Sequence, residues 1–191
     1  MPDWQEILAR DGPAAWRTAY RLLGNRADAD DCFQEACLAA VDVSRRELVH
    51  NWRGLLQRLA TARALDRLRS KIRARRERPL PRWDELPDRS PDPIQHAEEV
   101  ELAHELRLAL TQLPVKQAEV FCLHCLEDWS YDEIARHAHM TVTSVGVLLH
   151  RARKRLRELL GRFQEENTAT DRTTNRGHDR HAVAPERKEH S

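Results

Sequence analysis

No stretch of this 191-residue sequence is apolar over the length that a membrane-spanning helix needs, and residues 1–4 show no feature of a signal peptide. The sequence also has no Gly-rich phosphate-binding loop and no Ser, His and Asp spacing typical of hydrolases. It has only four Cys, which we expect to be thiols rather than disulfides. These absences favour a cytoplasmic protein that is not an enzyme.

Charge is present in quantity, but the net charge is only +1, so an argument for nucleic-acid binding must rest on its distribution. Residues 63–77 hold six Arg and one Lys against two acids, and residues 151–162 hold five Arg and one Lys against one Glu. Acidic residues gather in 28–35 and in 84–101. This segregation predicts two nucleic-acid contacts and at least one contact with a protein.

The most informative stretch, 129–160, predicts two helices joined by a tight turn. Ser130 and Glu133 have the spacing of a capping box, and Thr141 is the N-cap expected for the second helix. One face of that second helix is apolar: Val142, Val145, Leu149, Ala152, Leu156 and Leu159. The other face has small side chains first and cations later: Thr143, Ser144, Val147, His150, Arg151, Lys154 and Arg155. Since a helix in the major groove uses its N-terminal half on bases and nearby cations on phosphates, we predict a DNA-binding helix-turn-helix.

Helical periodicity continues on both sides of residues 79–93, which carry five of the nine Pro. Before this segment we expect helices over 4–10, 14–23, 27–43 and 52–76; after it, over 95–111 and from Pro114 onward. The prediction is therefore an all-α fold of two small helical domains joined by a Pro-rich linker, the C-terminal one a helix-turn-helix. The parts are a domain at 1–78, the linker at 79–94, a domain at 95–162 and a polar, disordered tail at 163–191.

Two helical faces in the first domain have both a simple and a functional explanation. The acids and amide of 27–43 (Asp30, Asp31, Gln34 and Glu35) could be solvated residues that favour a helix N-terminus. The cations that end helix 52–76 also compensate a helix dipole, but they are denser than that role requires. Phosphate binding is the better explanation for the cations.

Four stretches together resemble the extracytoplasmic-function (ECF) group of sigma factors, the sigma-70 type with only regions two and four. RLLGNRADADDCFQEACLAA resembles the polymerase-binding helix of region two, and NWRGLLQRLATARALDRLRSKIRARR resembles its promoter-melting helix. ALTQLPVKQAEVF resembles the start of region four, and SYDEIARHAHMTVTSVGVLLHRARKRLREL its helix-turn-helix. The resemblance covers nearly all of 14–160 except the linker.

The resemblance implies a sigma factor, which binds core RNA polymerase, directs it to specific promoters and assists their opening. Asp30, Asp31, Gln34 and Glu35 would dock on the largest polymerase subunit. Minus-ten DNA would be bound by Arg63, Asp66, Arg67, Arg69, Lys71 and Arg73. Minus-thirty-five DNA would be bound by Thr143, Ser144, Val147, His150, Arg151 and Lys154.

The same resemblance implies how the parts would be used. Region two would capture a flipped base of the non-template strand, so duplex opening would draw on binding energy. The linker would thread toward the polymerase active-site cleft and RNA exit channel, and the largest and second-largest subunits are the expected partners within the core enzyme. Promoter DNA and core polymerase are the expected partners, an anti-sigma factor is left open, and no cofactor or metal is expected.

The chain departs from the family pattern at three places. Ala62 stands where Asn is frequent, and His139 stands at a turn position where Gly is common, so we expect His139 in a left-handed conformation. Residues 146–148 are Gly-Val-Leu where the recognition helix usually has Lys-Ser-Arg. The last change removes two cations and a hydroxyl, so we expect readout to rely on apolar contacts and DNA shape.

Three other functions are compatible with parts of the sequence. A metal or thiol sensor could use Cys122 and Cys125 with His124, His137 and His139, or the pair Cys32 and Cys37, but the spacing fits a zinc site poorly. Cys122 and Cys37 also occupy apolar helical positions, where a thiol behaves as a small hydrophobe. A simple DNA-binding regulator would not need the acidic face followed by a second basic helix. An enzyme is the weakest alternative, because nothing pairs the carboxylates with a base.

Overall fold

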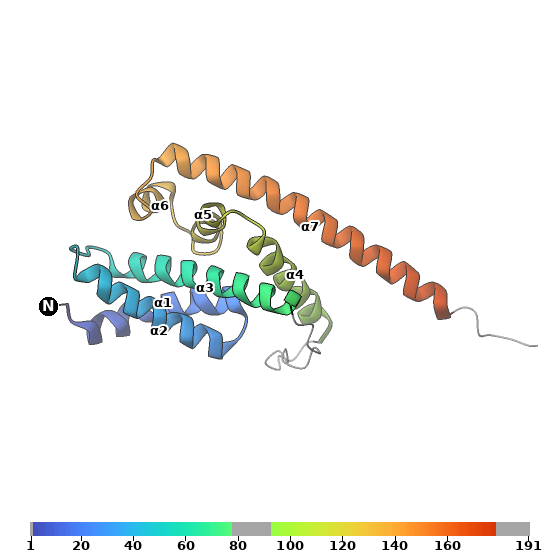
Figure 1. The fold of residues 1–191 in the computed structure, drawn as a ribbon, viewed down its shortest axis with the longest axis horizontal. Helices are drawn as coiled ribbons and strands as arrows, with labels where there is room; N and C mark the ends of the chain where they lie inside the picture. Colours follow the sequence, from blue (N-terminus) through green and yellow to red (C-terminus); the bar gives the residue numbers. More distant parts are fainter. Residues whose placement is uncertain (1, 78–92, 179–191) are drawn as a thin grey trace, which may run out of the picture.

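The computed structural model describes residues 2–77 and 93–178, and every regular element within these ranges is an α-helix. The first half contains α1 (Trp4–Leu23), α2 (Arg26–Ser44) and α3 (Trp52–Glu77). The second half contains α4 (Pro93–Thr111), α5 (Val115–Cys125), α6 (Tyr131–His137) and α7 (Val142–His178) (Figure 1). The predicted all-α fold is confirmed; most of the predicted linker, 78–92, lies outside the described residues. None of the described helices is long and apolar enough to cross a membrane.

The first helix corrects the sequence prediction, since α1 runs without interruption through Asp11, Gly12 and Pro13. A proline inside a helix removes one backbone hydrogen bond and costs roughly 3 kcal/mol. Here Pro13 faces solvent, whereas Gly12 is buried against the ring of Phe33. Packing of α1 on its neighbours therefore holds the helix continuous where local propensity predicts a break.

The other predicted boundaries of the first half are confirmed by their caps. Gly24 ends α1 with a φ of 76°, in the left-handed region that glycine adopts without steric cost. Asn25 begins α2, where its side chain accepts a hydrogen bond from the backbone N–H of Asp28 at 2.9 Å. This short connection places the start of α2 beside the end of α1.

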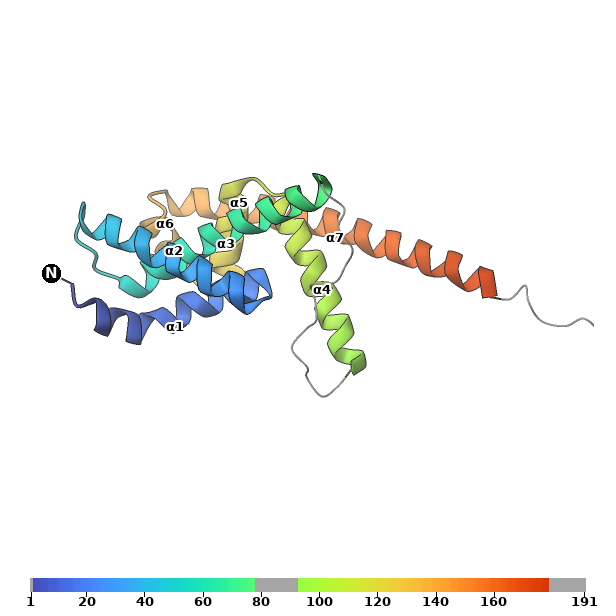
Figure 2. The same ribbon diagram turned by 60° about the horizontal axis from the view of Figure 1, so that its bottom comes forward.

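Helix α3 is the central element, and it is buried on more than one side. Leu55, Leu65 and Leu68 are buried on one stripe, and Leu56 and Thr61 on other sides of α3 are buried as well. The two views show why: α1 and α2 lie against one side of α3, and the second half lies against another (Figures 1 and 2).

Three hydrophobic clusters hold the molecule together. One lies within the first half, around Ile7, Ala36 and Leu56, and one within the second half, around Leu123, Ile134 and Leu149. The third joins the halves, and its members are Ala19, Leu22, Leu23, Ala29, Cys32, Ala64, Leu65, Leu68, Ala109, Leu110, Leu113, Ala118, Cys122, Ala152, Leu156 and Leu159. The two halves are thus packed on a shared core.

The end of the chain also differs from the expected disordered tail. The backbone of α7 remains helical to His178, sixteen residues beyond the predicted end of the second domain at 162, and residues 179–191 lie outside the described part. The polar composition after 162 excludes a core, and the Asn, Thr and Gly residues of 167–177 have low helix propensity, so the sequence does not predict this continuation of the helix.

Candidate nucleic-acid interface

The helix-turn-helix is built by the local signals that predicted it. Ser130 accepts from the backbone N–H of Glu133 at 3.2 Å, and the Glu133 carboxylate accepts from the backbone N–H of Ser130 at 2.8 Å, which completes the capping box. These bonds lower the pKa of Glu133. His139 has the expected positive φ, 51°, and Thr141 caps α7 by accepting from the N–H of Ser144 at 3.2 Å. The turn therefore sets the start of α7.

All six side chains predicted to face minus-thirty-five DNA are exposed: Thr143, Ser144, Val147, His150, Arg151 and Lys154. The opposite stripe is buried as predicted, with the exception of Val142, which is 43% exposed. Val142 lies too near the start of α7 to reach the core beneath it. It belongs instead to the surface that carries the reading residues.

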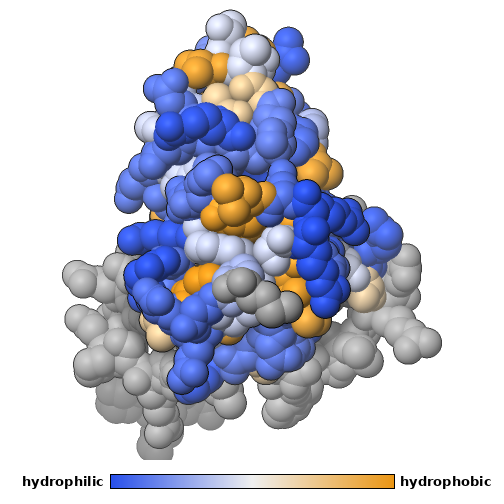
Figure 3. Space-filling model, turned by 90° about the vertical axis from the view of Figure 1, so that its left-hand side faces the viewer, coloured by the Kyte–Doolittle hydropathy of each residue, from blue (hydrophilic) through white to orange (hydrophobic). Residues whose placement is uncertain are grey.

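An open groove of about 510 Å³ lies on this surface, where α6 meets the first turns of α7. Its lining contains one cation and no carboxylate: Tyr131, Val142, Thr143, Gly146, Val147, His150 and Arg151. The end of the molecule where α6 and α7 meet carries separate hydrophobic side chains among hydrophilic ones (Figure 3). The sequence predicted the reading residues but not this groove, because Tyr131 comes from a different helix.

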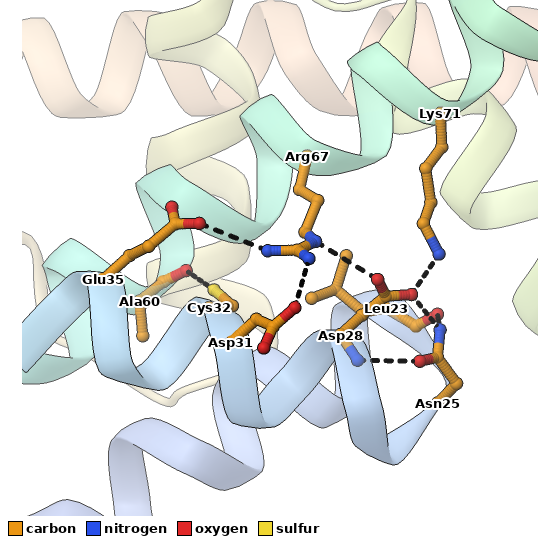
Figure 4. A network of polar contacts seen from close by, with 9 residues as sticks. All are labelled: Leu23, Asn25, Asp28, Asp31, Cys32, Glu35, Ala60, Arg67 and Lys71. Carbon is orange, nitrogen blue, oxygen red and sulfur yellow. Dashed lines mark hydrogen bonds and ion pairs between the residues drawn. The ribbon is translucent and has the colours of Figure 1, made fainter.

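The second basic region is partly engaged inside the molecule. Arg67 of α3 pairs with three carboxylates of α2: Asp31 at 2.6 Å, Asp28 at 3.1 Å and Glu35 at 3.2 Å (Figure 4). Lys71, one turn further along α3, pairs with Asp28. Two of the cations predicted to bind minus-ten DNA are thus held by acids of the first half.

Asp28 is the buried centre of this network. Burial by itself would raise its pKa, but hydrogen bonds from Lys71 and Asn25, together with the charge of Arg67, hold the pKa below its ordinary value. The carboxylate is therefore charged at neutral pH. It anchors the start of α2 to the middle of α3.

The other residues predicted for minus-ten DNA are divided in their exposure. Arg63, Asp66 and Arg73 are exposed. Arg69 has a side chain only 17% exposed; it pairs with Asp66 at 3.3 Å and donates to the carbonyl of Leu113 in the second half at 3.5 Å. In this arrangement the second half covers part of the predicted DNA-binding face of α3.

The acidic face of α2 is assembled largely as predicted. Asp30 accepts from the indole N–H of Trp16 at 2.7 Å, while Asp31 and Glu35 meet Arg67 and keep an exposed side. Gln34 is exposed. Leu38, which the sequence analysis did not select, is 69% exposed on the same face, one turn beyond Gln34. Its spacing of seven residues from Asp31 could have identified it.

Polar contacts join the two halves beside the shared core. Glu127, which is only 7% exposed, accepts from Arg21 at 3.0 Å and from Gln57 at 2.9 Å. Arg107 of α4 donates to the carbonyls of Leu22 at 3.0 Å and Arg21 at 3.2 Å. None of these residues was selected from the sequence, since nothing local distinguishes them from ordinary surface charges.

At the same interface, the His137 side chain of α6 lies close to the backbone near the start of α3. The Nε2 atom of His137 lies 3.3 Å from the Asn51 amide, and the His137 ring lies 4.9 Å from that of Trp129. A Cβ added to Gly54 would meet His137 Nε2 at 2.6 Å, so glycine permits this approach. Burial, with the nearby cations Arg58 and Arg136, lowers the pKa of His137.

The cysteines do not form a site in the described part of the chain. Cys32 and Cys122 are buried, and burial raises the pKa of both thiols, that of Cys32 to about 12. A thiol with a raised pKa is a poor nucleophile and a poor metal ligand. Within residues 2–77 and 93–178, no three His, Cys, Asp or Glu side chains come together as a metal site would require.

An all-helical chain with an exposed cationic helix-turn-helix and a second cationic helix belongs to the class of helical DNA-binding proteins. Comparison with known families narrows the class: residues 7–74 match the family "Sigma-70 region 2", and residues 103–156 match "Sigma-70, region 4". The chain therefore belongs to the sigma-70 family, in its ECF group, as the sequence predicted.

Individual relatives agree with this assignment. The chain is 31% identical over 166 residues to the ECF RNA polymerase sigma factor SigE of Mycolicibacterium smegmatis, covering 87% of this chain but only 65% of SigE. It is 26% identical over 153 residues to SigW of Bacillus subtilis, covering 76% of this chain and 82% of SigW. Its fold is similar to that of Bartonella quintana RpoE, solved with the anti-sigma factor NepR, with a TM-score of 0.52, 22% identity and coverage of 84% of this chain and 98% of RpoE.

Proposed function

We propose that this protein is a sigma factor: a dissociable subunit that binds core RNA polymerase, directs it to specific promoters and assists their opening. The observation that carries the proposal is the presence, in one chain and in the family's order, of matches to region two and region four. The exposed reading face of α7 gives the second match a surface suited to DNA. The protein acts by binding alone, catalyses no reaction, and works in the cytoplasm with the polymerase.

The polymerase contact is proposed for the exposed side of α2. Asp30, Asp31, Gln34 and Glu35 present acids and an amide to the largest subunit, and Leu38 adds an exposed apolar group beside them. Such a mixture suits a protein interface, where an apolar centre is surrounded by polar groups. The linker at 79–94 would thread toward the polymerase active-site cleft and RNA exit channel.

Promoter DNA is proposed to contact two separate surfaces. The upstream element meets Thr143, Ser144, Val147, His150, Arg151 and Lys154 on α7. The minus-ten element meets Arg63, Asp66, Arg67, Arg69, Lys71 and Arg73 on α3. Because Arg69 is covered by the second half, full use of the α3 surface requires the halves to separate. Arg67 would in addition have to leave its carboxylate partners on α2.

This requirement supports a functional division into a first unit at 1–78 and a second at 95–162, with the residues after 162 outside both. The two family matches fall on either side of the proposed linker. The closed arrangement described above would then be the form of the free protein. We propose an anti-sigma factor as a further partner, in parallel with the NepR complex of the RpoE fold relative.

The test is run-off transcription with core polymerase and genomic fragments from the source organism. We expect discrete transcripts only when this chain is added, starting at sites that share two short sequence elements. Failure of the chain to associate with core polymerase, or to select any start site, would refute the proposed function.

A further inference from the structure

The glycine in the recognition helix has no structural explanation in the described part of the chain. The φ of Gly146 is not positive, so its conformation is open to other residues. A Cβ added there would meet only Tyr131 Cε2, at 3.6 Å, which is ordinary van der Waals contact. Gly12 and Gly54 differ, since an added Cβ would meet a neighbour at 3.1 Å and 2.6 Å.

Gly146 nevertheless has a cost, because glycine inside a helix is about 1 kcal/mol less favourable than alanine. What it provides is space: the missing side chain leaves the groove between Tyr131 and the first turns of α7 open to solvent. Glycine is also used where a ligand approaches the backbone closely, and Gly146, unlike Gly161, lines a groove on the predicted reading face.

The groove is poor in hydrogen-bonding groups at its centre. Val142 and Val147 are 43% and 44% exposed, and they lie beside the Tyr131 ring. The Ser144 hydroxyl lies nearby but is 2.8 Å from that of Thr141, so it is engaged within the cap. A ligand part that enters this groove therefore has to be apolar and small.

The charges around the groove indicate which kind of molecule carries the apolar group that enters it. Arg151 lines the groove, and Lys154 and Arg155 are exposed one turn further along α7. The lining contains no carboxylate. Cations beside an apolar groove on a recognition helix favour duplex DNA over an apolar protein segment.

In the major groove, the C5-methyl of thymine is the one apolar group on the base edges. We propose that the groove at Gly146 receives thymine methyl groups, so that this protein selects A·T pairs in its upstream element by apolar contact. Val142, Val147 and the Thr143 methyl provide the contact surface, and Gly146 provides the depth. The inference rests on the proposed function, since it assumes that α7 reads promoter DNA.

The test replaces thymine by deoxyuridine, which removes only the methyl. A promoter duplex identified by run-off transcription is prepared with deoxyuridine at one upstream position at a time, on either strand. Holoenzyme formed from the full chain and core polymerase is then titrated with each duplex. We expect about fourfold weaker binding at one or two adjacent positions, the loss expected for one buried methyl, and no change elsewhere.

A substitution at Gly146 tests whether the effect of deoxyuridine arises in the groove. Gly146→Val fills the space without lowering helix propensity, so the fold is retained. We expect this variant to bind the thymine and deoxyuridine duplexes equally. The matched control is Gly161→Val on the same helix, where an added Cβ meets nothing within 4 Å and the wild-type difference should persist.

The outcomes separate this inference from the proposed function. Promoter-specific transcription without any deoxyuridine effect would overturn the thymine assignment alone, as would an unchanged effect in Gly146→Val. An upstream element without A·T pairs would overturn it too. Absence of promoter-specific transcription would instead refute the proposed function.

Discussion

At the scale of single residues, Arg67 has two uses that compete. Its guanidinium meets Asp28, Asp31 and Glu35 of α2, yet the family resemblance places it on minus-ten DNA. Phosphates and these carboxylates are alternative partners for the same cation. The proposed polymerase-binding face and the proposed DNA-binding face are therefore adjacent and electrostatically linked through one side chain.

The acidic face can be tested by reversing its charge. Combining Asp31→Lys with Gln34→Ala should abolish co-purification with core polymerase. The new lysine would place a positive charge on a face whose negative charge the polymerase is expected to bind. Glu47→Lys, an equal charge change on an exposed loop, should leave co-purification intact. Normal association of the double variant would show that the face is merely solvated.

Asp28 predicts a pH dependence of stability. Since its pKa is lower in the folded protein than in the unfolded chain, it contributes stability above about pH 4 that is lost as pH falls through its folded pKa. Asp28→Asn should reduce the free energy of unfolding by roughly 1–3 kcal/mol at pH 7. The difference from wild type should shrink in acid.

Urea denaturation at pH 7 and at pH 3 measures this difference. Asp42→Asn serves as the control, because Asp42 is 62% exposed in its pair with Arg45 and should change stability little. A deficit in Asp28→Asn that is equally large in acid would contradict a charged role for Asp28.

Arg151 predicts a change in salt dependence. Arg151→Ala should weaken the promoter complex and lower the slope of log K against log salt by about 0.9, the contribution of one phosphate contact. Filter binding of holoenzyme over a salt series gives the slope. Arg45→Ala, an exposed cation outside both DNA surfaces, should keep the wild-type slope; if Arg151→Ala keeps it too, Arg151 makes no phosphate contact.

At the scale of elements, α3 decides the arrangement of the molecule. It supplies core residues to the first half and to the cluster shared between the halves. Its start approaches α6 so closely that a Cβ added at position 54 would meet His137 Nε2 at 2.6 Å, so a larger residue there requires the His137 side chain to move. The same helix therefore carries the predicted minus-ten surface and the contacts with the second half, which covers part of that surface.

A larger side chain at position 54 should separate the halves. Gly54→Leu raises helix propensity by close to 1 kcal/mol but cannot coexist with the His137 ring in its present position. We expect α3 to remain folded while the radius of gyration, measured by X-ray scattering, increases. Gly161→Leu should leave the radius unchanged. A closed Gly54→Leu protein would mean that the interface adjusts around the substitution.

At the scale of the whole molecule, the free chain is closed by the shared cluster and by the polar contacts of Glu127 and Arg107. Separation of the halves would expose this shared apolar cluster, so the closed form is favoured until a partner binds. A partner that binds the open form better than the closed one shifts the population toward it. Core polymerase is the partner expected to do so.

Opening can be followed by energy transfer between dyes on exposed positions 46 and 162, one in each half. The half-buried Cys37 and Cys125 would be replaced by alanine to avoid unwanted labelling. Transfer should fall when core polymerase is added. A control pair at 17 and 46, both in the first half, should not change. Undiminished transfer in the bound complex would contradict the two-surface proposal.

Local signals in the sequence were sufficient for the helix-turn-helix. The capping box of Ser130 and Glu133, the cap at Thr141 and the positive φ of His139 all depend on residues a few positions apart. The apolar periodicity likewise predicted which face of α7 is buried, except at Val142. Such features follow from helix geometry, which repeats every three to four residues.

Tertiary structure decided what lies beyond that range. The continuation of α1 through Pro13 depends on packing, and the pairing of Arg67 with Asp31 joins residues 36 positions apart. The groove beside Gly146 exists because Tyr131 arrives from another helix. By itself the sequence determined most of the helices, their caps and the family. Contacts between helices decided which charges are paired and which surface is covered. Pairing and coverage depend on how the helix faces pack in space, which no local pattern in the sequence records.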